Sequence, residues 1–435
     1  MRFGSVLLAL AVASAPSAAP APSSPLPPVK THREQAALHR TFLERRFERL
    51  LPELMRRHGL DMWIVVTREY DDDPVFRALA PLTTYASRRR TILVFHDRGP
   101  GQGVERLSIG RFDYDRLYTV VPTHNDGQWA GLRALLDQRQ PRAIGIDTSR
   151  TFAHADGISH TEHEALVAAI GPVHAARLRS AERLAVDWLG RRLPEETAVY
   201  REAQAIAHAI IREAFSAAVI TPGVTTTDDV AWWMRQRVAE LGLGQWFQPT
   251  VDIQRKGGVQ GGSRVIERGD LLHCDFGIVY LGYATDTQHN AYVPHQGELA
   301  APAGLQAGQR AGTRLQDIVL EEARAGVTGN AALAASLARG RGEQLSPVIY
   351  CHPIGIHGHG AGPHIGMTDY QDGLPGAGDY AFEPESWHSI ELSASRPVPE
   401  WDGQVVRFAL EEDAVLTSTG WRWALARQDD LLLVR

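Results

Sequence analysis

Two aspartates in one predicted β-hairpin constrain the fold of this chain more than any other feature. Segment 271–286 alternates apolar and polar residues on both sides of a turn, which is typical of a hairpin. If the turn is centred between Tyr280 and Leu281, Asp275 lies directly opposite Asp286, with Cβ atoms roughly 4.5–5.5 Å apart. Two carboxylates so close in an apolar setting repel, so one is protonated or a cation lies between them. Aspartates are also common in exposed turns, but a divalent metal ion is the natural solution between strands.

A glycine-rich segment further along the chain carries a cluster of histidines. Its thirteen residues contain His352, His357, His359 and His364. Glycine lets the backbone and a substrate approach closely, and histidine supplies nitrogen ligands and proton shuttles. A single histidine is usually a core residue, but four of them in a glycine-rich loop indicate a functional site.

Two strand-like segments near the C-terminus each offer a glutamate as a further ligand. Glu391 lies between apolar neighbours in a short β-like run, although it can also be a solvated edge residue. In the later segment, Glu412 shares its face with apolar residues, whereas Glu411 shares a mixed face. Alternation therefore predicts that Glu412 points inward, where a carboxylate is costly unless it is paired or bound to metal.

In chain order the candidate ligands are Asp, Asp, His, Glu and Glu, and this set resembles that of the pita-bread metallopeptidases. That group contains aminopeptidase P, prolidase and methionine aminopeptidase. The resemblance covers about residues 190–435 and rests on these residues: Asp275-Phe276-Gly277, Asp286 eleven residues later, Gly358 to Gly362, Glu391 and Glu412-Asp413. It implies an α+β pita-bread catalytic domain, preceded by an α/β domain like that of creatinase.

The resemblance also implies a role for each ligand. Asp275 would hold one of two divalent ions, and Asp286 and Glu412 would bridge both. His359 and Glu391 would complete the ligand set of the second ion, and Glu391 would also take a proton from the bridging water. Such a pair of ions clamps the attacking and leaving oxygens and generates hydroxide near neutral pH. The excess of carboxylates favours Mn²⁺, and Zn²⁺ or Co²⁺ also suits the set.

The remaining histidines would act on the substrate, and two residues are rivals for ligand positions. One of His352, His357 and His364 would donate hydrogen bonds to the tetrahedral intermediate or shuttle protons. Family members usually have a second histidine four residues before the ligand and another seven after it. Counted from His359, both positions are glycine; counted from His357, the later one is His364, so His357 is a rival ligand. Glu383, which precedes a proline, is a rival to Glu391.

The function implied is that of a two-metal exopeptidase that removes an N-terminal residue, as Xaa-Pro aminopeptidases do. The family's substrate-side histidine, expected near Gly258, is missing, and Gln288-His289 replaces its Thr-Arg pair. These departures leave room for a non-peptide C–N hydrolase such as creatinase, or for a lyase. A third alternative is a peptide-binding module without catalysis, as in some histone chaperones, but such modules usually lose the ligands.

The N-terminal region is predicted to contain three parts. Residues 1–21 have the charged start, apolar run and small residues of a secretory signal, so we expect export to the periplasm or medium. Residues 22–32 are rich in proline, alanine and serine and are predicted to be disordered. Residues 33–180 alternate helical and β-branched segments, which indicates an α/β domain. This domain has no clustered ligands, so its expected roles are to cover the active site and to form a homodimer or larger homo-oligomer.

Composition excludes several kinds of partner. The formal net charge is −6 and basic residues are not concentrated in one block, so nucleic acid is not an expected partner. No segment after the signal is long and apolar enough to span a bilayer. The only two cysteines, Cys274 and Cys351, lie in apparent core motifs, where buried free thiols are as reasonable as a disulfide.

Overall fold

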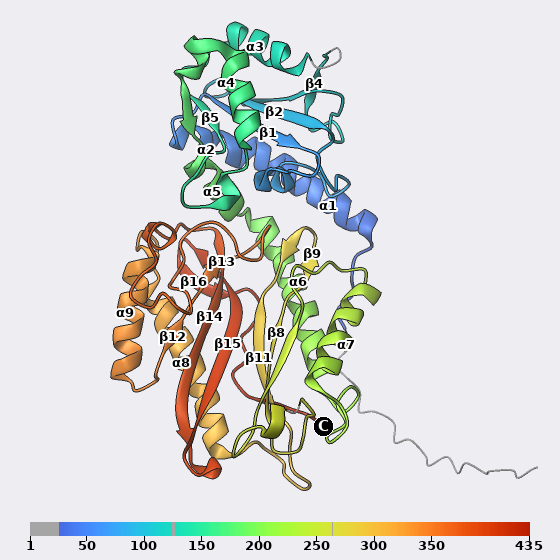
Figure 1. Cartoon of the computed structure of the whole chain (residues 1–435), viewed down its shortest axis with the longest axis vertical. Helices are drawn as coiled ribbons and strands as arrows, with labels where there is room; N and C mark the ends of the chain where they lie inside the picture. Colours follow the sequence, from blue (N-terminus) through green and yellow to red (C-terminus); the bar gives the residue numbers. More distant parts are fainter. Residues whose placement is uncertain (1–25, 124–126, 263) are drawn as a thin grey trace, which may run out of the picture.

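The computed structural model describes residues 26–123, 127–262 and 264–435. Among these residues the chain forms two separate main sheets, the smaller lying above the larger in Figure 1. The predicted signal sequence lies outside the described residues. No helix in the described part has the length and apolar character needed to cross a membrane.

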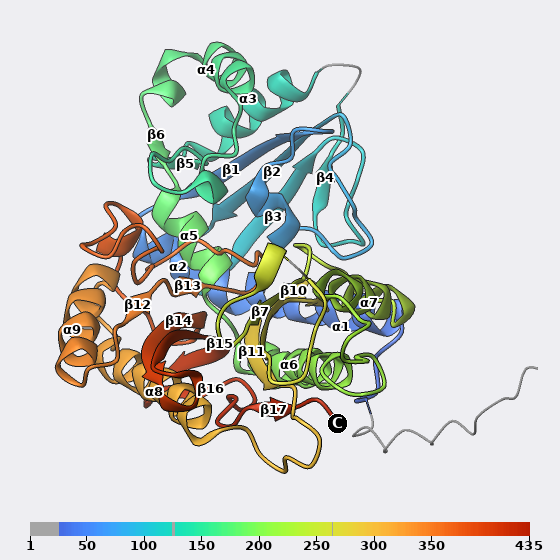
Figure 2. The same ribbon diagram turned by 60° about the horizontal axis from the view of Figure 1, so that its bottom comes forward.

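The smaller sheet belongs to an α/β domain, as predicted. Its strand order is β4-β3-β2-β1-β5-β6. The strands are β1 (Met62–Arg68), β2 (Arg90–Asp97), β3 (Val104–Ile109), β4 (Thr119–Val121), β5 (Ile144–Ile146) and β6 (Leu178–Ser180). The helices α3 (Gln128–Arg139) and α4 (His160–Ala175) pack on one face, as Figure 2 shows. The other face packs on α1 (His32–Arg45), α2 (Leu51–Arg57) and α5 (Glu182–Gly190).

The larger sheet has nine strands in the described residues and forms the α+β body expected from the sequence. Its main path runs β12-β14-β15-β11-β8-β7, with β13, β16 and β17 attached beside it. The strands are β7 (Thr250–Gln254), β8 (Leu271–Phe276), β11 (Thr287–Tyr292), β12 (Val348–Ile349), β13 (His352–Pro353), β14 (Ser386–Val398), β15 (Gln404–Thr417), β16 (Gly420–Trp423) and β17 (Leu432–Leu433). A separate hairpin, β9 (Val279–Tyr280) with β10 (Tyr283–Ala284), connects β8 to β11.

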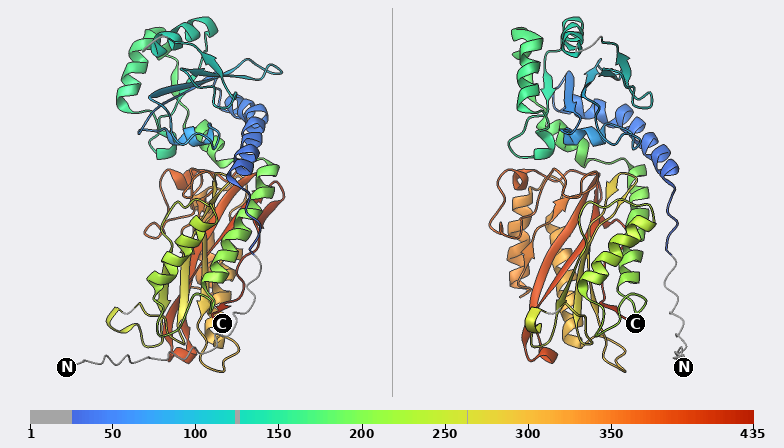
Figure 3. Two further views of the ribbon diagram at one scale, coloured as in Figure 1. Left: turned by 90° about the vertical axis from the view of Figure 1, so that its right-hand side faces the viewer. Right: turned by 45° about the vertical axis from the view of Figure 1, so that its right-hand side comes forward.

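Within the described residues, four helices accompany this sheet, and Figure 3 shows them beside its long strands. They are α6 (Pro194–Ala214), α7 (Thr227–Glu240), α8 (Ala303–Glu322) and α9 (Gly329–Gly342). α8 approaches β15 closely because Gly308 and Gly312 have no side chains, and a Cβ at either would collide with Phe408 or Leu410. The helix-covered face of β15 therefore belongs to the apolar core.

The structure also fixes local boundaries in both parts of the chain. Between β11 and β12 the chain forms two helices, α8 and α9, since it leaves the helical conformation after Glu322 and turns through Gly326 at φ +82°. The end of the predicted disordered leader packs instead, since Leu26 and Val29 contact the core and the ammonium of Lys30 lies 2.5 Å from Glu202. Cys274 and Cys351 are buried free thiols.

Candidate metal centre

Strand register brings four of the polar side chains into one row across the larger sheet. Asp275 on β8 pairs with Gln288 on β11, and Gln288 pairs with Glu411 on β15. Glu411 in turn pairs with Glu391 on β14. Paired residues on neighbouring strands point to the same side of a sheet. Asp286 precedes Gln288 by two residues and so belongs to this side as well.

The predicted hairpin exists, but its turn is shifted by one residue. Tyr280 pairs with Tyr283, so the turn residues are Leu281 and Gly282, and Leu281 has φ +56°. Asp275 consequently pairs with Gln288 rather than lying directly opposite Asp286 as expected. The two aspartates are diagonal neighbours on one face, and their oxygens still belong to one group of ligand atoms within 4.8 Å.

The structure corrects the choice between the two adjacent glutamates of β15. Glu411 faces the aspartates and forms a group of possible metal ligands with Asp275 and Asp286. Glu412 points to the other side, where its carboxylate contacts His208 and His289. The geometry therefore brings Glu411, and not Glu412, together with the other predicted ligands.

The alternation argument failed because both faces of β15 are buried at this point. The apolar face is the one that α8 covers, and Glu412 is tolerated there because two imidazoles contact its carboxylate. The mixed face of Glu411 is the side on which polar ligands gather. The inward-pointing carboxylate of Glu412 therefore belongs to a buried cluster with two histidines and not to the candidate centre.

His352 is the histidine that the structure places against the carboxylates. Its Nε2 lies 3.4 Å from Glu411 Oε1, 3.7 Å from Asp286 Oδ2 and 3.9 Å from Glu391 Oε2. It forms one group of possible ligands with Glu391 and Glu411. His359 is adjacent, with its ring centroid 4.7 Å from that of His352, and forms a group with His352 and Asp286.

The other predicted candidates lie apart from these groups. His357 Nε2 lies 3.2 Å from the carbonyl oxygen of Pro74 in the smaller domain. His364 Nδ1 lies 3.0 Å from the carbonyl oxygen of Gly362. Glu383 is partly exposed and accepts a 2.6 Å hydrogen bond from Arg57. The structure thus favours Glu391 over Glu383 as the neighbour of the aspartates.

Three further side chains complete the site, and sequence reasoning did not identify them as contributors. The Gln288 amide donates to Glu391 Oε1, and at 2.9 Å to Glu411 Oε2. Ser389 donates a 2.5 Å hydrogen bond to Glu411 Oε1. The Trp246 ring packs edge-on to His359 at 5.0 Å and forms one wall beside it. Only Gln288 carried a signal, because it departs from the family pattern two residues after Asp286.

Burial and mutual repulsion raise the pKa values of the acidic residues in the row. Burial, and then the charge of Glu411, raises the pKa of Asp275 to about 7. Burial also raises the pKa of Glu411 to about 7. The same two causes raise the pKa values of Asp286 and Glu391 well above their ordinary range. Burial lowers the pKa of His352 to about 4, which keeps its imidazole neutral at pH 7.

The residues fit the binding of divalent metal. Asp275 Oδ1, Asp286 Oδ1 and His352 Nε2 are buried and have no hydrogen-bond partner. Buried polar atoms are rarely left unsatisfied, and cations offset the repulsion between buried carboxylates. Mixed carboxylate and imidazole ligands suit Mn²⁺, Co²⁺ or Zn²⁺. Ligands of this kind must be deprotonated, so ion binding and protonation compete.

We expect the stability of the protein in a chelator to fall as pH rises from about 4 to 7. Asp275 and Glu411 have pKa values of about 7 when folded, whereas an unfolded carboxyl has a pKa near 4. The folded state therefore holds protons that the unfolded state has released. Each such proton lowers the free energy of unfolding by about 1.4 kcal/mol per pH unit in that window. Urea unfolding in EDTA at several pH values measures this slope.

Two comparisons check the origin of this slope. Glu411→Gln removes one titrating group, so the stability of this variant should depend less steeply on pH than that of wild type. Added Mn²⁺ replaces the protons, so the rise in Tm on adding Mn²⁺ should be larger at pH 8 than at pH 5. An equal slope in wild type and Glu411→Gln would contradict the assignment of the titration to this row.

Comparisons with known proteins show the family and the fold of the chain. A model of metallopeptidase family M24 matches residues 198–418, more than half of the 435-residue chain. No curated protein matches the chain. An X-Pro aminopeptidase from Thermotoga maritima is similar in structure, with a TM-score of 0.64 and 17% identity over 88% of this chain and 100% of that one.

Two other solved structures share the fold. A dipeptidase from Pyrococcus horikoshii has a TM-score of 0.60 and 15% identity, over 88% of this chain and 99% of that one. The N-terminal domain of a FACT complex subunit from chickpea has a TM-score of 0.57 and 11% identity, over 91% of this chain and 99% of that one. At these identities the likeness concerns the fold, an N-terminal domain followed by a pita-bread domain. On the match to its family model, the chain belongs to metallopeptidase family M24.

Proposed function

We propose that the protein is a dinuclear-metal-dependent exopeptidase that cleaves an N-terminal residue from a following proline. One observation carries the proposal: two groups of possible ligands share Glu411. The first group is Asp275, Asp286 and Glu411, and the second is His352, Glu391 and Glu411. Asp286 also lies near His352, so both Asp286 and Glu411 are placed to contact two ions. Mn²⁺ is our first choice because carboxylates outnumber histidines.

The chain's own side chains can position and move protons around this pair. Two divalent ions, when bound, supply Lewis acidity and hydroxide near neutral pH. Burial raises the pKa of Glu391, which favours its proton-bound form and suits the carboxylate to receive a proton. The Gln288 amide holds Glu391 and Glu411 in place by donating to both. His359 is exposed at the mouth of the site and can donate a hydrogen bond to a carbonyl oxygen that gains charge.

The substrate class is proposed from the similar structures and from the side chains that surround His359. An X-Pro aminopeptidase and an Xaa-Pro dipeptidase share the two-domain fold, the latter with a TM-score of 0.57. Trp246 and His359 pack edge-on beside the carboxylates, and together they offer aromatic and imidazole surface that suits an apolar ring such as proline. His154 of the smaller domain covers this side, with its ring 4.8 Å from that of His357.

The test is hydrolysis of Xaa-Pro dipeptides and Xaa-Pro-Yaa tripeptides by protein stripped with EDTA and reloaded with Mn²⁺. We expect turnover only after reloading, and loss of at least about 10³-fold in kcat/KM for Asp286→Asn. Matched peptides with alanine in place of proline measure specificity. Metal binding without turnover of any peptide, together with turnover of creatine, would favour the C–N hydrolase alternative. A protein that binds no divalent ion would instead be a peptide-binding module.

A further inference from the structure

The candidate centre lies on a seam of the larger sheet that few backbone hydrogen bonds hold. β11 and β15 share a single registered pair in the described residues, Gln288 with Glu411. By contrast, the ladder between β14 and β15 is continuous. It runs from the pair Ser386 and Leu416 to the pair Val398 and Gln404. The ligands Asp286 and Glu411 lie on opposite sides of this seam. Something other than the ladder must therefore hold their separation constant.

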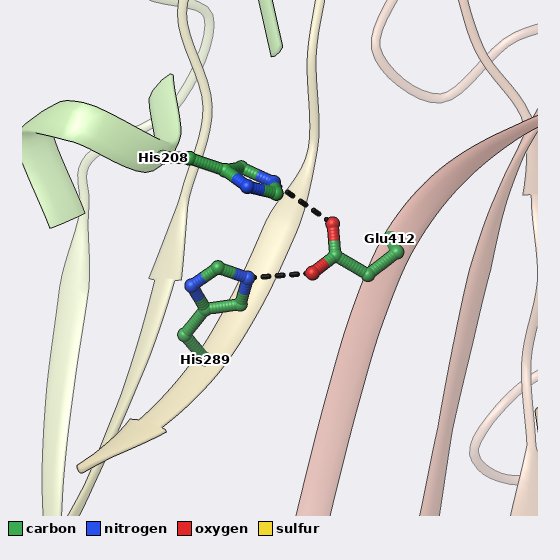
Figure 4. A group of neighbouring side chains, drawn as sticks. All are labelled: His208, His289 and Glu412. Atoms are coloured by element: carbon green, nitrogen blue, oxygen red, sulfur yellow. Dashed lines mark hydrogen bonds and ion pairs between the residues drawn. The ribbon is translucent and has the colours of Figure 1, made fainter. Parts of the chain in front are cut away.

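A buried cluster on the helix side of the seam joins the two strands. Glu412 Oε1 lies 2.6 Å from His289 Nε2, and its Oε2 lies 2.9 Å from His208 Nε2 (Figure 4). The backbone N–H of Gln428 donates a further 3.0 Å hydrogen bond to Oε1. The three side chains come from α6, β11 and β15, and each is at most 5% exposed. The cluster thus connects a helix to both edges of the seam.

α6 extends this connection along the seam through a row of polar residues. Tyr200, Gln204 and His208 are spaced four apart, so they lie on one face of the helix. Tyr200 donates a 2.6 Å hydrogen bond to Asp413 Oδ2, and Gln204 donates to the same oxygen. This oxygen also accepts a 3.2 Å hydrogen bond from the backbone N–H of Asp286. The row therefore holds Glu412 and Asp413, the two residues that follow Glu411 on β15, and through Asp413 the backbone of Asp286.

The distances favour a hydrogen-bonded clasp over a third metal site. Ligand atoms around a tetrahedral zinc ion, at about 2.0–2.1 Å from it, are about 3.3 Å apart. The separations of 2.6 and 2.9 Å to Glu412 are those of hydrogen bonds between imidazole and carboxylate. Although burial disfavours a charged carboxylate, the imidazoles of His208 and His289 lower the pKa of Glu412 to about 2. Charged hydrogen bonds of this kind satisfy the group without an ion.

We propose that His208 and His289 are positioning residues, which clasp Glu412 and thereby hold Glu411 and Asp286 at the spacing that metal binding requires. Consecutive residues of a strand point to opposite faces, so fixing Glu412 on one face fixes Glu411 on the other. The inference rests on the proposed function, because it concerns the affinity of that centre for metal. It also gives a role to Gln288-His289, which replaces the family's Thr-Arg pair. Gln288 donates to the glutamates of the centre, and His289 contacts Glu412 in the clasp.

Titration of EDTA-treated protein with Co²⁺ tests the clasp, with visible absorption reporting the ligand geometry around the ion. Wild type should bind two Co²⁺ per chain. His208→Leu should weaken binding of at least one ion by about 10–100-fold, as loss of an outer hydrogen bond typically does, and should alter the absorption bands. His208→Gln keeps a donor and should recover most of the affinity. All measurements are made below the unfolding temperature of each variant.

A matched control separates positioning from stability. His174 is buried in α4 of the smaller domain, with Nε2 2.8 Å from Asp137 Oδ1, and α4 packs on the smaller sheet rather than on the sheet that contains the seam. His174→Leu should lower Tm but leave Co²⁺ affinity and spectrum unchanged. If His208→Leu does not fold, Glu412→Gln, which keeps the side-chain shape, should weaken Co²⁺ binding in the same direction.

Three results would overturn the inference in different ways. Wild-type affinity and spectrum in both His208→Leu and Glu412→Gln would show that the clasp does not position the ligands. A third Co²⁺ in wild type that disappears in Glu412→Gln would show that the cluster is itself a metal site. No Co²⁺ bound by wild type would overturn the proposed function, and with it the inference.

Discussion

Glu411→Gln is expected to lower kcat/KM for an Xaa-Pro dipeptide by at least about 10³-fold, whereas Glu412→Gln should lower it by only about 10–100-fold. Glu411 belongs to both groups of possible ligands, so the loss of its charge should weaken the binding of both ions. Glu412 acts on the centre only through its neighbours, because its carboxylate contacts His208 and His289 on the other face. The two variants differ by one position and carry the same chemical change, so each is a control for the other.

Metal content and kinetics on the same samples measure this difference. Glu411→Gln should retain fewer than two ions per chain after dialysis, and excess Mn²⁺ should restore little of kcat. Glu412→Gln should regain most of its activity in excess Mn²⁺, because its defect lies in affinity. If Glu412→Gln were the more damaged of the two, the assignment of Glu411 to the centre would be wrong.

Glu196→Ala is expected to destabilise the protein by about 3–5 kcal/mol, the usual cost of leaving a buried charge unpaired. Glu196 at the start of α6 is fully buried, and both of its oxygens lie 3.2 Å from Arg46 Nη1. It also accepts 2.6 Å hydrogen bonds from Tyr283 and from the backbone of Leu193. The substitution would leave Arg46, which is 3% exposed, without its carboxylate between the two domains.

Urea unfolding followed by circular dichroism measures this effect. Glu196→Gln should cost less, because its amide oxygen still accepts a hydrogen bond. Arg46→Met combined with Glu196→Leu should recover much of the loss, because a buried ion pair replaced by apolar residues is often neutral. A loss below about 1 kcal/mol for Glu196→Ala would show that water reaches this pair.

Much of the candidate centre could be predicted because local pattern and chain order were sufficient. The structure brings Asp275, Asp286 and Glu391 together, and the sequence selected all three. The α/β domain also followed from the pattern of helical and β-branched segments, and the α+β body followed from the family resemblance of the ligand set. The position of the hairpin turn was wrong by one residue, since alternation alone does not fix where a turn is centred.

The choice of Glu412 shows where sequence reasoning stops. The positions of α6 and α8 decide which face of β15 carries the site. The sequence of β15 alone does not determine where these helices pack. The spacing within the histidine segment also points to His352. Counted from His352, the position seven residues later is His359, which matches the family spacing. The structure agrees, because His352 Nε2 faces Glu411 at 3.4 Å.

The central claim is that two ions bind between Asp275 and His352 and share Asp286 and Glu411. Anomalous diffraction from crystals grown with Mn²⁺ tests it most directly. The account predicts two anomalous peaks per chain, one beside Asp275 and one beside His352, each contacting both Asp286 and Glu411. A single peak, or a peak at Glu412 with none beside Glu411, would contradict it.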